Sequence, residues 1–387
     1  MSLPKNGEPR AETSLFLSAG EVSGDLAGAD LARELFAQGP PGTALRGLGG
    51  PAMAAAGVRL EENLLRHAVM GVTRVVARLP SLVRLLARIR RILETERPDA
   101  VVPIDYPGLH FRVAAMAREL GIPVASYVSP QIWAWAPARI EKIRRLVDRM
   151  IVILPFEERY YAERGVDAVF VGHPALDRIA AHAPDPALDE ALRGPLVAIL
   201  PGSRAQEITA HLPVLLEAAS RMAAEEKGLR HAIAYPGDDD AVFAWIQRTL
   251  ARAPIAARTT VLRGRAYDVM RRARVALVSS GTATLELAVF GVPMAILYRT
   301  GRVAAGLARR LLRTRMIGLA NILAGRKVVP EYLTAGNPAP EMAAAALRLL
   351  RDGPERERAL VELRAVKESL GPPGVAARAA REVLRLL

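Results

Sequence analysis

A turn that could bind an anion lies in the second half of the chain, in LPGSRAQEI, residues 200–208. A short apolar run precedes the turn and a helical pattern follows it. Gly202 permits a tight turn, Ser203 can cap the helix, and Arg204 offers a forked cation that suits a diphosphate. Backbone N–H groups at a helix start also attract anions. A capped turn with a surface arginine would give the same pattern, so the turn alone leaves both interpretations open.

A second turn of this kind lies in VSSGTATLELAVFGVP, residues 278–293. Ser280, Gly281 and Thr282 are small enough to let a ligand approach the backbone at the end of a strand. Glu286 lies near the start of the helix that follows, where a carboxylate can bind a pair of sugar hydroxyls or simply stabilise the helix dipole. Two such turns in one half of the chain favour a nucleotide site.

Two further stretches carry weaker signals. NILAGRKVVPEYL, residues 321–333, supplies the amide of Asn321 and the cations Arg326 and Lys327. The acidic run 238–240 has the Asp-x-Asp pattern of some divalent-metal sites, but acids at the start of a helix more often compensate its dipole. We therefore predict no metal site.

The first half offers a candidate general base in PDAVVPIDYPGLHFR, residues 98–112. Asp105 follows an apolar strand, so its carboxylate is expected at the carboxyl edge of a sheet. His110 is an alternative base. Without a catalytic role, Asp105 would be a turn residue before Pro107, and His110 would be a structural imidazole.

The opening motif SAGEVSGDLAG, residues 18–28, joins a strand to a helix but matches neither dinucleotide-binding glycines nor a P-loop. Glu21 and Asp25 lie where a phosphate would be repelled. We therefore expect this loop to hold something other than a phosphate.

The longest uncharged run, residues 120–138, is interrupted by three prolines, which argues against a membrane-spanning helix. It includes YVSPQIWAWAP, residues 127–137, with two of the three tryptophans. These aromatic side chains could line an apolar groove, although core packing under a loop is the commoner use.

Strand-like runs alternate with helical patterns along most of the chain, which predicts parallel sheets covered on both faces. We expect two doubly wound α/β domains, with the ligand in a cleft between them. The domains are residues 12–172 and 196–352, joined by a Pro-rich linker at 173–195, and residues 353–387 are helical. The expected strands are 14–18, 43–48, 100–104, 124–127, 150–154, 168–171, 196–200, 232–234, 260–262, 275–278 and 294–297.

Composition narrows the classes of function. The 387 residues include no cysteine, which excludes disulfides and thiolate chemistry. A net charge of +13 favours anionic partners such as nucleic acid, acidic lipids or phosphorylated substrates. Basic stripes at Arg84, Arg88 and Arg91 and at 301–315 could lie on an anionic membrane or be solvated helix faces. The polar N-terminus has no signal-peptide pattern.

The chain resembles the lipid-A-disaccharide synthase family, which are inverting glycosyltransferases of the GT-B fold. The matching stretches lie between residues 14 and 335: SAGEVSGDLAGADL, VMGVTRVV, PDAVVPIDYPG, YVSPQIWAWAPARIEKI, LPFE, FVGHPALD, LPGSRAQEI, SSGTATLELAVFGVPM and NILAGRKVVPEYL. The resemblance implies transfer of 2,3-diacylglucosamine from UDP-2,3-diacylglucosamine to 2,3-diacylglucosamine 1-phosphate, which gives the β-1,6-linked lipid A disaccharide 1-phosphate and UDP. It implies neither a metal nor another cofactor.

The resemblance also implies roles for the residues of the second domain. The family binds the nucleotide there, so Arg204 is expected to neutralise the diphosphate in the turn that Gly202 and Ser203 form. The second turn, with Ser280, is expected to offer the backbone of Gly281 and Thr282. Two further positions are implied in the site: Glu286 would bind the ribose, and Asn321 matches an active-site position. The final helices, 353–387, are expected to cross back to the first domain.

On the acceptor side the chain departs from the family. Many members have Asp-x-Pro-Asp-Phe-Asn where this sequence has DYPGLH, so the second acid is Gly108 and the final Asn is His110. We therefore expect Asp105 or Glu21 to act as the base. The other residues expected on the acceptor side are Ser23, Gly24, Asp25 and His110.

The acylated substrates imply a cytoplasmic protein held peripherally on the inner face of a Gram-negative inner membrane, with no nucleic-acid partner; a homodimer stays open. Two rival functions also stay open. One is a UDP-N-acetylglucosamine 2-epimerase, an isomerase on the same fold. The other is a non-catalytic basic module, which would explain the net charge but not the two strand-end turns.

Overall fold

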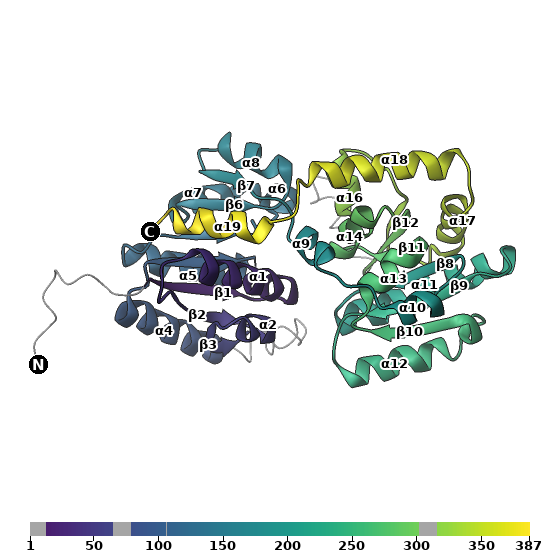
Figure 1. Cartoon of the computed structure of the whole chain (residues 1–387), viewed down its shortest axis with the longest axis horizontal. Helices are drawn as coiled ribbons and strands as arrows, with labels where there is room; N and C mark the ends of the chain where they lie inside the picture. The colour runs from purple at the N-terminus through teal and green to yellow at the C-terminus, as the bar shows by residue number, and fades with distance from the viewer. Residues whose placement is uncertain (1–12, 65–78, 106, 302–315) are drawn as a thin grey trace, which may run out of the picture. The chain divides into compact units, whose positions relative to one another are not determined.

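The computed structural model of the chain describes residues 13–64, 79–105, 107–301 and 316–387. The chain divides into two compact units. The first holds residues 1–177 together with 372–387, and the second holds residues 178–371. Each unit is built on one parallel sheet with helices packed on it (Figure 1).

The first unit has a seven-stranded sheet in the order β3-β2-β1-β4-β5-β6-β7, with every neighbouring pair parallel. The central strands are continuously apolar because helices cover both faces of the sheet. The strands are β1 (Ser14–Ala19), β2 (Ala44–Gly49), β3 (Arg59–Asn63), β4 (Ala100–Ile104), β5 (Ala125–Tyr127), β6 (Arg149–Val152) and β7 (Ala168–Phe170).

The helices of this unit are amphipathic where they cover the sheet, as α4 illustrates. Ile89 and Leu93 of α4 are fully buried, whereas its arginines at 84, 88 and 91 are exposed. The second basic stripe that we predicted, 301–315, lies outside the described residues apart from Gly301. The helices are α1 (Val22–Gln38), α2 (Pro51–Ala55), α4 (Leu79–Glu96), α5 (Pro107–Glu119), α6 (Ile132–Trp135), α7 (Ile140–Leu146), α8 (Pro155–Ala162) and α19 (Val375–Leu384).

The second unit has a six-stranded parallel sheet in the order β10-β9-β8-β11-β12-β13. Its strands are β8 (Leu196–Leu200), β9 (Arg230–Tyr235), β10 (Thr259–Arg263), β11 (Ala273–Ser279), β12 (Met294–Arg299) and β13 (Glu331–Thr334). Its helices are α10 (Pro186–Ala191), α11 (Ala205–Glu225), α12 (Asp240–Leu250), α13 (Ala266–Arg272), α14 (Thr282–Phe290), α16 (Leu319–Ala324), α17 (Ala339–Leu350) and α18 (Pro354–Ser369), while α9 (Ala175–Ala180) spans the boundary between the units.

Each sheet has one point at which the strand order reverses, and doubly wound sheets bind ligands at the carboxyl ends of the strands there. The reversal falls between β1 and β4 in the first unit and between β8 and β11 in the second. Gly20, Glu21 and the start of α1, together with Asp105, follow the first pair of strands, and the turns at 201–204 and 280–282 follow the second pair. The topology therefore places these segments at the carboxyl ends of the strands on either side of each reversal.

The prediction of two doubly wound parallel-sheet units is confirmed. Each expected strand has a counterpart in the structure, and the observed ends differ from the expected ones by no more than two residues. The two strands that we missed, β3 and β13, are edge strands. β3 has the sequence RLEEN, whose charges conceal the strand pattern.

The chain returns to the first unit at residue 372, so α19 belongs to the first unit and α18 to the second. The carboxylate of Asp177 caps α19 by accepting hydrogen bonds from the backbone N–H groups of Gly374, Val375 and Ala376, at 2.6–3.1 Å. The expected linker at 173–195 contains α9 and α10.

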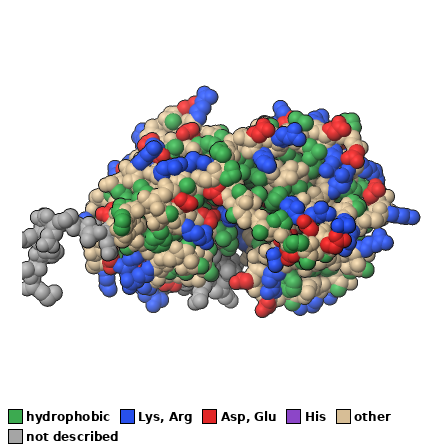
Figure 2. Space-filling model, in the orientation of Figure 1, with side chains coloured by type: hydrophobic (Ala, Val, Ile, Leu, Met, Phe, Trp, Pro, Cys, Tyr) green, Lys and Arg blue, Asp and Glu red, His purple; other side chains and the backbone are tan. Residues whose placement is uncertain are grey.

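In the described ranges, no helix combines the length and apolar character that crossing a membrane requires. Lys and Arg side chains lie on both units, with Asp and Glu side chains among them (Figure 2).

Candidate active site

The two predicted turns of the second unit lie next to each other. Gly202, at the end of β8, has a φ of +118°, which L side chains rarely adopt. A methyl group at this position would lie 2.8 Å from Oε2 of Glu207 and 3.3 Å from Oγ of Ser279, the last residue of β11. Glycine is therefore required for the close approach of the first turn to the strand that leads into the second.

The start of α11 already binds a negatively charged group of its own helix. Ser203 donates its backbone N–H to Oε2 of Glu207 at 3.3 Å, and Nη1 of Arg204 lies 2.7 Å from Oε1. The Arg204 side chain is 57% exposed, so it is accessible to a ligand from solvent. A helix start that holds a carboxylate in this way has the donors that a phosphate requires.

The second turn is fixed by its own side chains. Oγ of Ser280 donates to the carbonyl of Ile317 at 2.7 Å, and Oγ1 of Thr284 donates to the carbonyl of Gly281 at 2.8 Å. Gly281 is exposed at the start of α14, with Thr282 next to it. Ser280 therefore shapes the turn, and Gly281 and Thr282 present its backbone.

Glu286 lies one turn further along α14 and has a partner on the neighbouring helix. The hydroxyl of Tyr267, in α13, donates to Oε1 of Glu286 at 2.9 Å. Burial raises the pKa of Glu286, while the hydrogen bond from Tyr267 and the positive charge of Arg178 act to lower it. The carboxylate is thus partly desolvated and held from one side.

Asn321 is fully buried, and its amide is completely used within the protein. Nδ2 donates to the carbonyl of Val329 and to Oε2 of Glu331, at 3.0 and 2.9 Å, and Oδ1 accepts from the N–H groups of Val328 and Val329. The side chain therefore fixes the loop before β13, and a role of Asn321 in the nucleotide site stays a prediction.

Glu331 is a residue that the sequence analysis missed. Its Oε2 accepts from the backbone N–H groups of Ile317 and Gly318, at 3.1 Å each, as well as from Asn321. The backbone carbonyl of Ile317 in turn accepts a hydrogen bond from the hydroxyl of Ser280. Glu331 therefore holds the segment that supports the second turn.

His211 supports the first turn in a similar way. Nε2 accepts from the N–H of Arg299 at 3.1 Å, so Nδ1 carries the proton that it donates to the carbonyl of Pro201 at 3.2 Å. Burial lowers the pKa of His211, which keeps it in this neutral form. It ties the end of β8 to the end of β12.

In the first unit, Gly24 brings the start of α1 against the end of β4. A methyl group at Gly24 would lie 3.3 Å from the carbonyl oxygen of Ile104 and 3.8 Å from Cβ of Asp105. Asp105 has a φ of +55°, a strained conformation that costs about 1–3 kcal/mol and is common at functional sites. Ser23 is exposed beside Gly24, and Glu21 immediately precedes α1. These residues therefore lie near the carboxyl ends of β1 and β4.

Asp25 is buried, and its carboxylate caps α2. Its two oxygens accept from the N–H groups of Gly50, Ala52 and Met53, at 2.7, 2.9 and 3.1 Å. We expected this acid on the acceptor side, but its acceptor capacity is already used by the start of a helix. We therefore assign it a structural role.

His110 is also buried, and both of its ring nitrogens have partners. Nε2 lies 2.9 Å from Oγ of Ser18, and Nδ1 bonds the backbone carbonyl of Asp105. Because a carbonyl only accepts, Nδ1 carries the proton and Nε2 accepts from the serine hydroxyl. Burial lowers the pKa of His110 to about 4. A neutral, fully engaged imidazole supports Asp105 and is not itself suited to be the base or an acceptor contact.

In the stretch 127–137, which includes α6, the side chains of Tyr127, Ile132 and Trp133 are buried. Oε1 of Glu157, in α8, accepts from Oγ of Ser129 at 2.6 Å and from Nε1 of Trp133 at 2.9 Å. Trp133 is 8% exposed, so it lines no open groove. Burial raises the pKa of Glu157 to about 7.

The described residues contain no group of three His, Cys, Asp or Glu side chains that could hold a metal. In the acidic run 238–240, Asp239 caps α12 by accepting from Ala241 and Val242, and Asp240 pairs with Arg263 at 2.7 Å. Asp239 and Asp240 therefore have partners within the protein.

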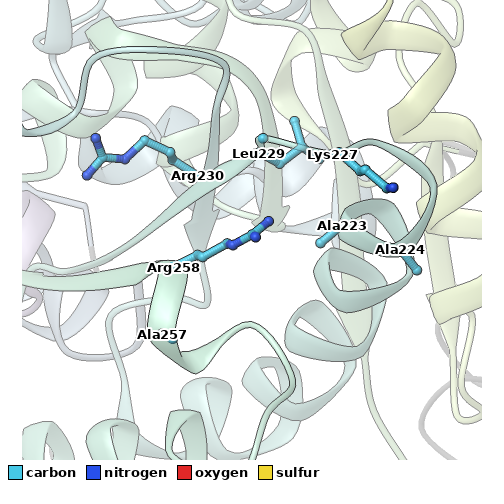
Figure 3. A pocket seen from close by; sticks show the side chains of 8 residues that line it. Ala223, Ala224, Lys227, Leu229, Arg230, Ala257 and Arg258 are labelled. Atoms are coloured by element: carbon cyan, nitrogen blue, oxygen red, sulfur yellow. The ribbon is translucent and has the colours of Figure 1, made fainter.

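A cavity of about 760 Å³ lies in the second unit by the amino ends of β9 and β10. Figure 3 shows Arg230 and Lys227 pointing in opposite directions there, so their charges do not converge on one ligand. Doubly wound sheets bind ligands at the carboxyl ends of their strands, which is the end opposite to this cavity.

The fold is shared with a protein solved together with UDP and with a glycosyltransferase. The chain matches the structure of S. aureus MnaA with UDP with a TM-score of 0.68 at 13% identity, covering 97% of this chain and 98% of that one. It matches the glycosyltransferase of kitacinnamycin with a TM-score of 0.65 at 19% identity, covering 98% and 100%. These likenesses define the class as GT-B, which includes both glycosyltransferases and epimerases.

Sequence relatives separate these two groups. The chain is 39% identical over 382 residues to the lipid-A-disaccharide synthase of Syntrophus aciditrophicus, covering 96% of this chain and 97% of the relative. It is 40% identical over 396 aligned positions to that of Anaeromyxobacter dehalogenans strain 2CP-1, covering 98% and 99%. The family model for lipid-A-disaccharide synthetase matches residues 15–382. The chain therefore belongs to the lipid-A-disaccharide synthase family, whose members are glycosyltransferases.

Proposed function

We propose that the protein transfers 2,3-diacylglucosamine from UDP-2,3-diacylglucosamine to 2,3-diacylglucosamine 1-phosphate, with inversion at the anomeric carbon. The observation that carries this proposal is membership of the family over residues 15–382. The geometry supports it, because Asp105 in the first unit and the two turns in the second follow the strands between which the strand order reverses.

We assign the UDP to the second unit. The diphosphate would take the place of the Glu207 carboxylate at the start of α11, with donors from Ser203 and Arg204 in the turn that Gly202 makes. The N–H groups of Gly281 and Thr282, at the start of α14, add further donors. Glu286 would accept hydrogen bonds from the ribose hydroxyls.

We assign the acceptor to the first unit, with Asp105 as the general base. The carboxylate removes the proton of the acceptor 6-hydroxyl, whose oxygen forms the bond to the anomeric carbon while the bond to UDP breaks. Such a base contributes about 10²–10⁴-fold in rate. The departing UDP keeps the bonding electron pair, and the donors around Arg204 stabilise its charge by several kcal/mol, which is about the scale of preorganised electrostatics.

The proposal is tested by incubating the purified protein with both acylated sugars and following the products by mass spectrometry. We expect the disaccharide 1-phosphate and UDP in equal amounts. A parallel reaction contains UDP-N-acetylglucosamine alone. If its 2-epimer forms there while no disaccharide forms in the first reaction, the protein is an epimerase instead.

The choice of base is tested with Asp105→Asn and Glu21→Gln. We expect kcat to fall by about 10²–10⁴-fold in Asp105→Asn, as loss of a general base requires, and to change less than tenfold in Glu21→Gln. The opposite order would make Glu21 the base. Full activity in both variants would exclude both carboxylates.

We also propose that the protein works peripherally on the inner face of the inner membrane. Both proposed substrates carry acyl chains, and the net charge of +13 favours an anionic surface. The exposed arginines of α4 would contribute to this attraction.

A further inference from the structure

Tyr267 contacts the carboxylate of Glu286 but belongs to neither of the two turns assigned to the diphosphate. It lies in α13, on the connection from β10 to β11, whereas Glu286 lies in α14, on the connection from β11 to β12 (Figure 1). The 2.9 Å bond from the phenol to Oε1 therefore joins two successive helices of the second unit.

The ring of Tyr267 is held from two sides. It makes an edge-to-face contact with His182, with ring centroids 5.6 Å apart, and a tilted contact with Phe290 at 5.8 Å. His182 is itself anchored, because its Nε2 lies 3.2 Å from Oδ1 of Asp268. The phenol hydroxyl cannot swing away from Glu286 without losing these ring contacts.

A glutamate benefits from such a partner because its side chain has three rotatable bonds, and fixing them on ligand binding costs entropy. The phenol occupies one lone pair of Oε1, and the remaining acceptor positions of the carboxylate stay available to ligand hydroxyls. Burial raises the pKa of Glu286, and the hydrogen bond from Tyr267 and the charge of Arg178 act against this shift, towards the ionised, accepting form.

We propose that Tyr267 is a positioning residue that fixes the carboxylate of Glu286 and thereby sets how strongly the protein recognises the ribose hydroxyls of UDP. This inference rests on the proposed function, in which Glu286 binds the ribose. Tyr267 itself touches no substrate.

The experiment compares the Kd values of UDP, 2′-deoxy-UDP and 3′-deoxy-UDP by calorimetry. The proteins are the wild type, Tyr267→Phe, Glu286→Gln and Tyr332→Phe. Tyr332 is the matched control, because its hydroxyl donates to the backbone carbonyl of Glu341, in α17, instead of to Glu286. Thermal unfolding of each variant checks that it is folded.

We expect the wild type to bind UDP about tenfold more tightly than at least one deoxy analogue, as for a hydrogen bond to a charged group. In Tyr267→Phe this ratio falls to about threefold or less, because UDP binds more weakly while that analogue binds as before. In Glu286→Gln the ratio falls at least as far as in Tyr267→Phe, and in Tyr332→Phe it stays at the wild-type value. If Tyr267→Phe does not fold, His182→Leu is used, which removes one ring contact and is expected to lower the same ratio.

The other outcomes are distinguishable. A ratio that survives in Tyr267→Phe, or in His182→Leu where that variant replaces it, but is lost in Glu286→Gln overturns the role of Tyr267 and leaves the UDP site in place. Equal weakening of all three ligands in Tyr267→Phe also overturns it. If the wild type binds UDP and both deoxy analogues equally well, Glu286 does not bind the ribose, and this inference is overturned as well. A wild type that binds no UDP overturns the proposed function.

Discussion

Asp105 and His110 are linked by a hydrogen bond, and His110 supports the backbone at Asp105. Asp105 has a left-handed φ of +55°, and the ring of His110 bonds its backbone carbonyl. The second ring nitrogen of His110 is bonded to Ser18, at the end of β1. The imidazole therefore ties the neighbouring strands β1 and β4 together at their carboxyl ends. Where many family members have an asparagine, this chain uses a buried histidine to hold the candidate base in place.

The burial of His110 makes stability depend on pH. Its pKa is lowered from 6.5 to about 4, so between these values the unfolded chain binds a proton that the folded chain does not. The free energy of unfolding that it contributes therefore falls as the pH falls from 6.5 towards 4, by up to about 1.4 kcal/mol per pH unit. We expect His110→Asn to flatten this dependence by that amount, as measured by urea denaturation at pH 7, 5.5 and 4.5. Parallel curves for the two proteins would contradict the assignment of a buried neutral imidazole.

Arg204 is predicted to act mainly on the departing diphosphate. Its guanidinium lies at the start of α11, where it now pairs with Glu207. In Arg204→Ala we expect kcat/KM to fall by about 10²–10³-fold, the scale for losing one preorganised donor to a developing charge. Stability should change by less than about 1 kcal/mol, since the pair is exposed. Arg221→Ala, which removes another exposed arginine paired within α11, is the control. Turnover of Arg204→Ala within threefold of the wild type would remove Arg204 from this role.

At the scale of elements, the loop between α16 and β13 acts as a brace for the second turn. Asn321 fixes the loop at Val328 and Val329, and Glu331 joins it to Ile317, which receives the hydroxyl of Ser280. This route from β13 to Ser280 explains how a buried amide without a free donor could still affect a nucleotide site.

Glu331→Gln tests this brace. Oε2 now accepts three hydrogen bonds, and a glutamine amide that presented its NH₂ group there would face the N–H donors of Ile317 and Gly318. We expect unfolding to become easier by about 1–3 kcal/mol, the range for an unsatisfied buried group, and UDP to bind several-fold more weakly. Glu341→Gln, at the exposed start of α17, serves as the control. Unchanged UDP affinity together with lost stability would confine Glu331 to folding.

The sequence could predict the elements but not these braces. The expected strands are recognisable because helices bury both faces of the sheets, so the strands are continuously apolar. The two turns are recognisable because small residues follow such strands. Tyr267, Glu331 and Glu157 carry no local signal, since each acts on a residue that lies in another element. The capping role of Asp25 could not be predicted for the same reason: its partners lie more than twenty residues away, at the start of α2.

At the scale of the whole molecule, charge is the property that neither fold nor turns explain. The net charge of +13 means that cations outnumber acids, and α4 exposes Arg84, Arg88 and Arg91, of which Arg88 pairs with Glu61 and Glu62. α4 also leaves Val83 62% exposed. Cations beside an exposed apolar side chain are typical of a helix that lies on an anionic lipid surface.

Replacement of Arg84, Arg88 and Arg91 by Gln tests this surface. Each basic residue near an anionic membrane contributes about 1 kcal/mol, so the triple variant should bind vesicles containing anionic lipid at least about tenfold more weakly than the wild type at low salt. Binding of the wild type should also fall as salt rises, because the attraction is screened. The control replaces Arg221, Arg248 and Arg252, exposed arginines of the second unit, and so removes the same charge. Equal losses in both variants would show that net charge alone drives binding, and sedimentation of neither protein with vesicles at low salt would exclude the membrane as a partner.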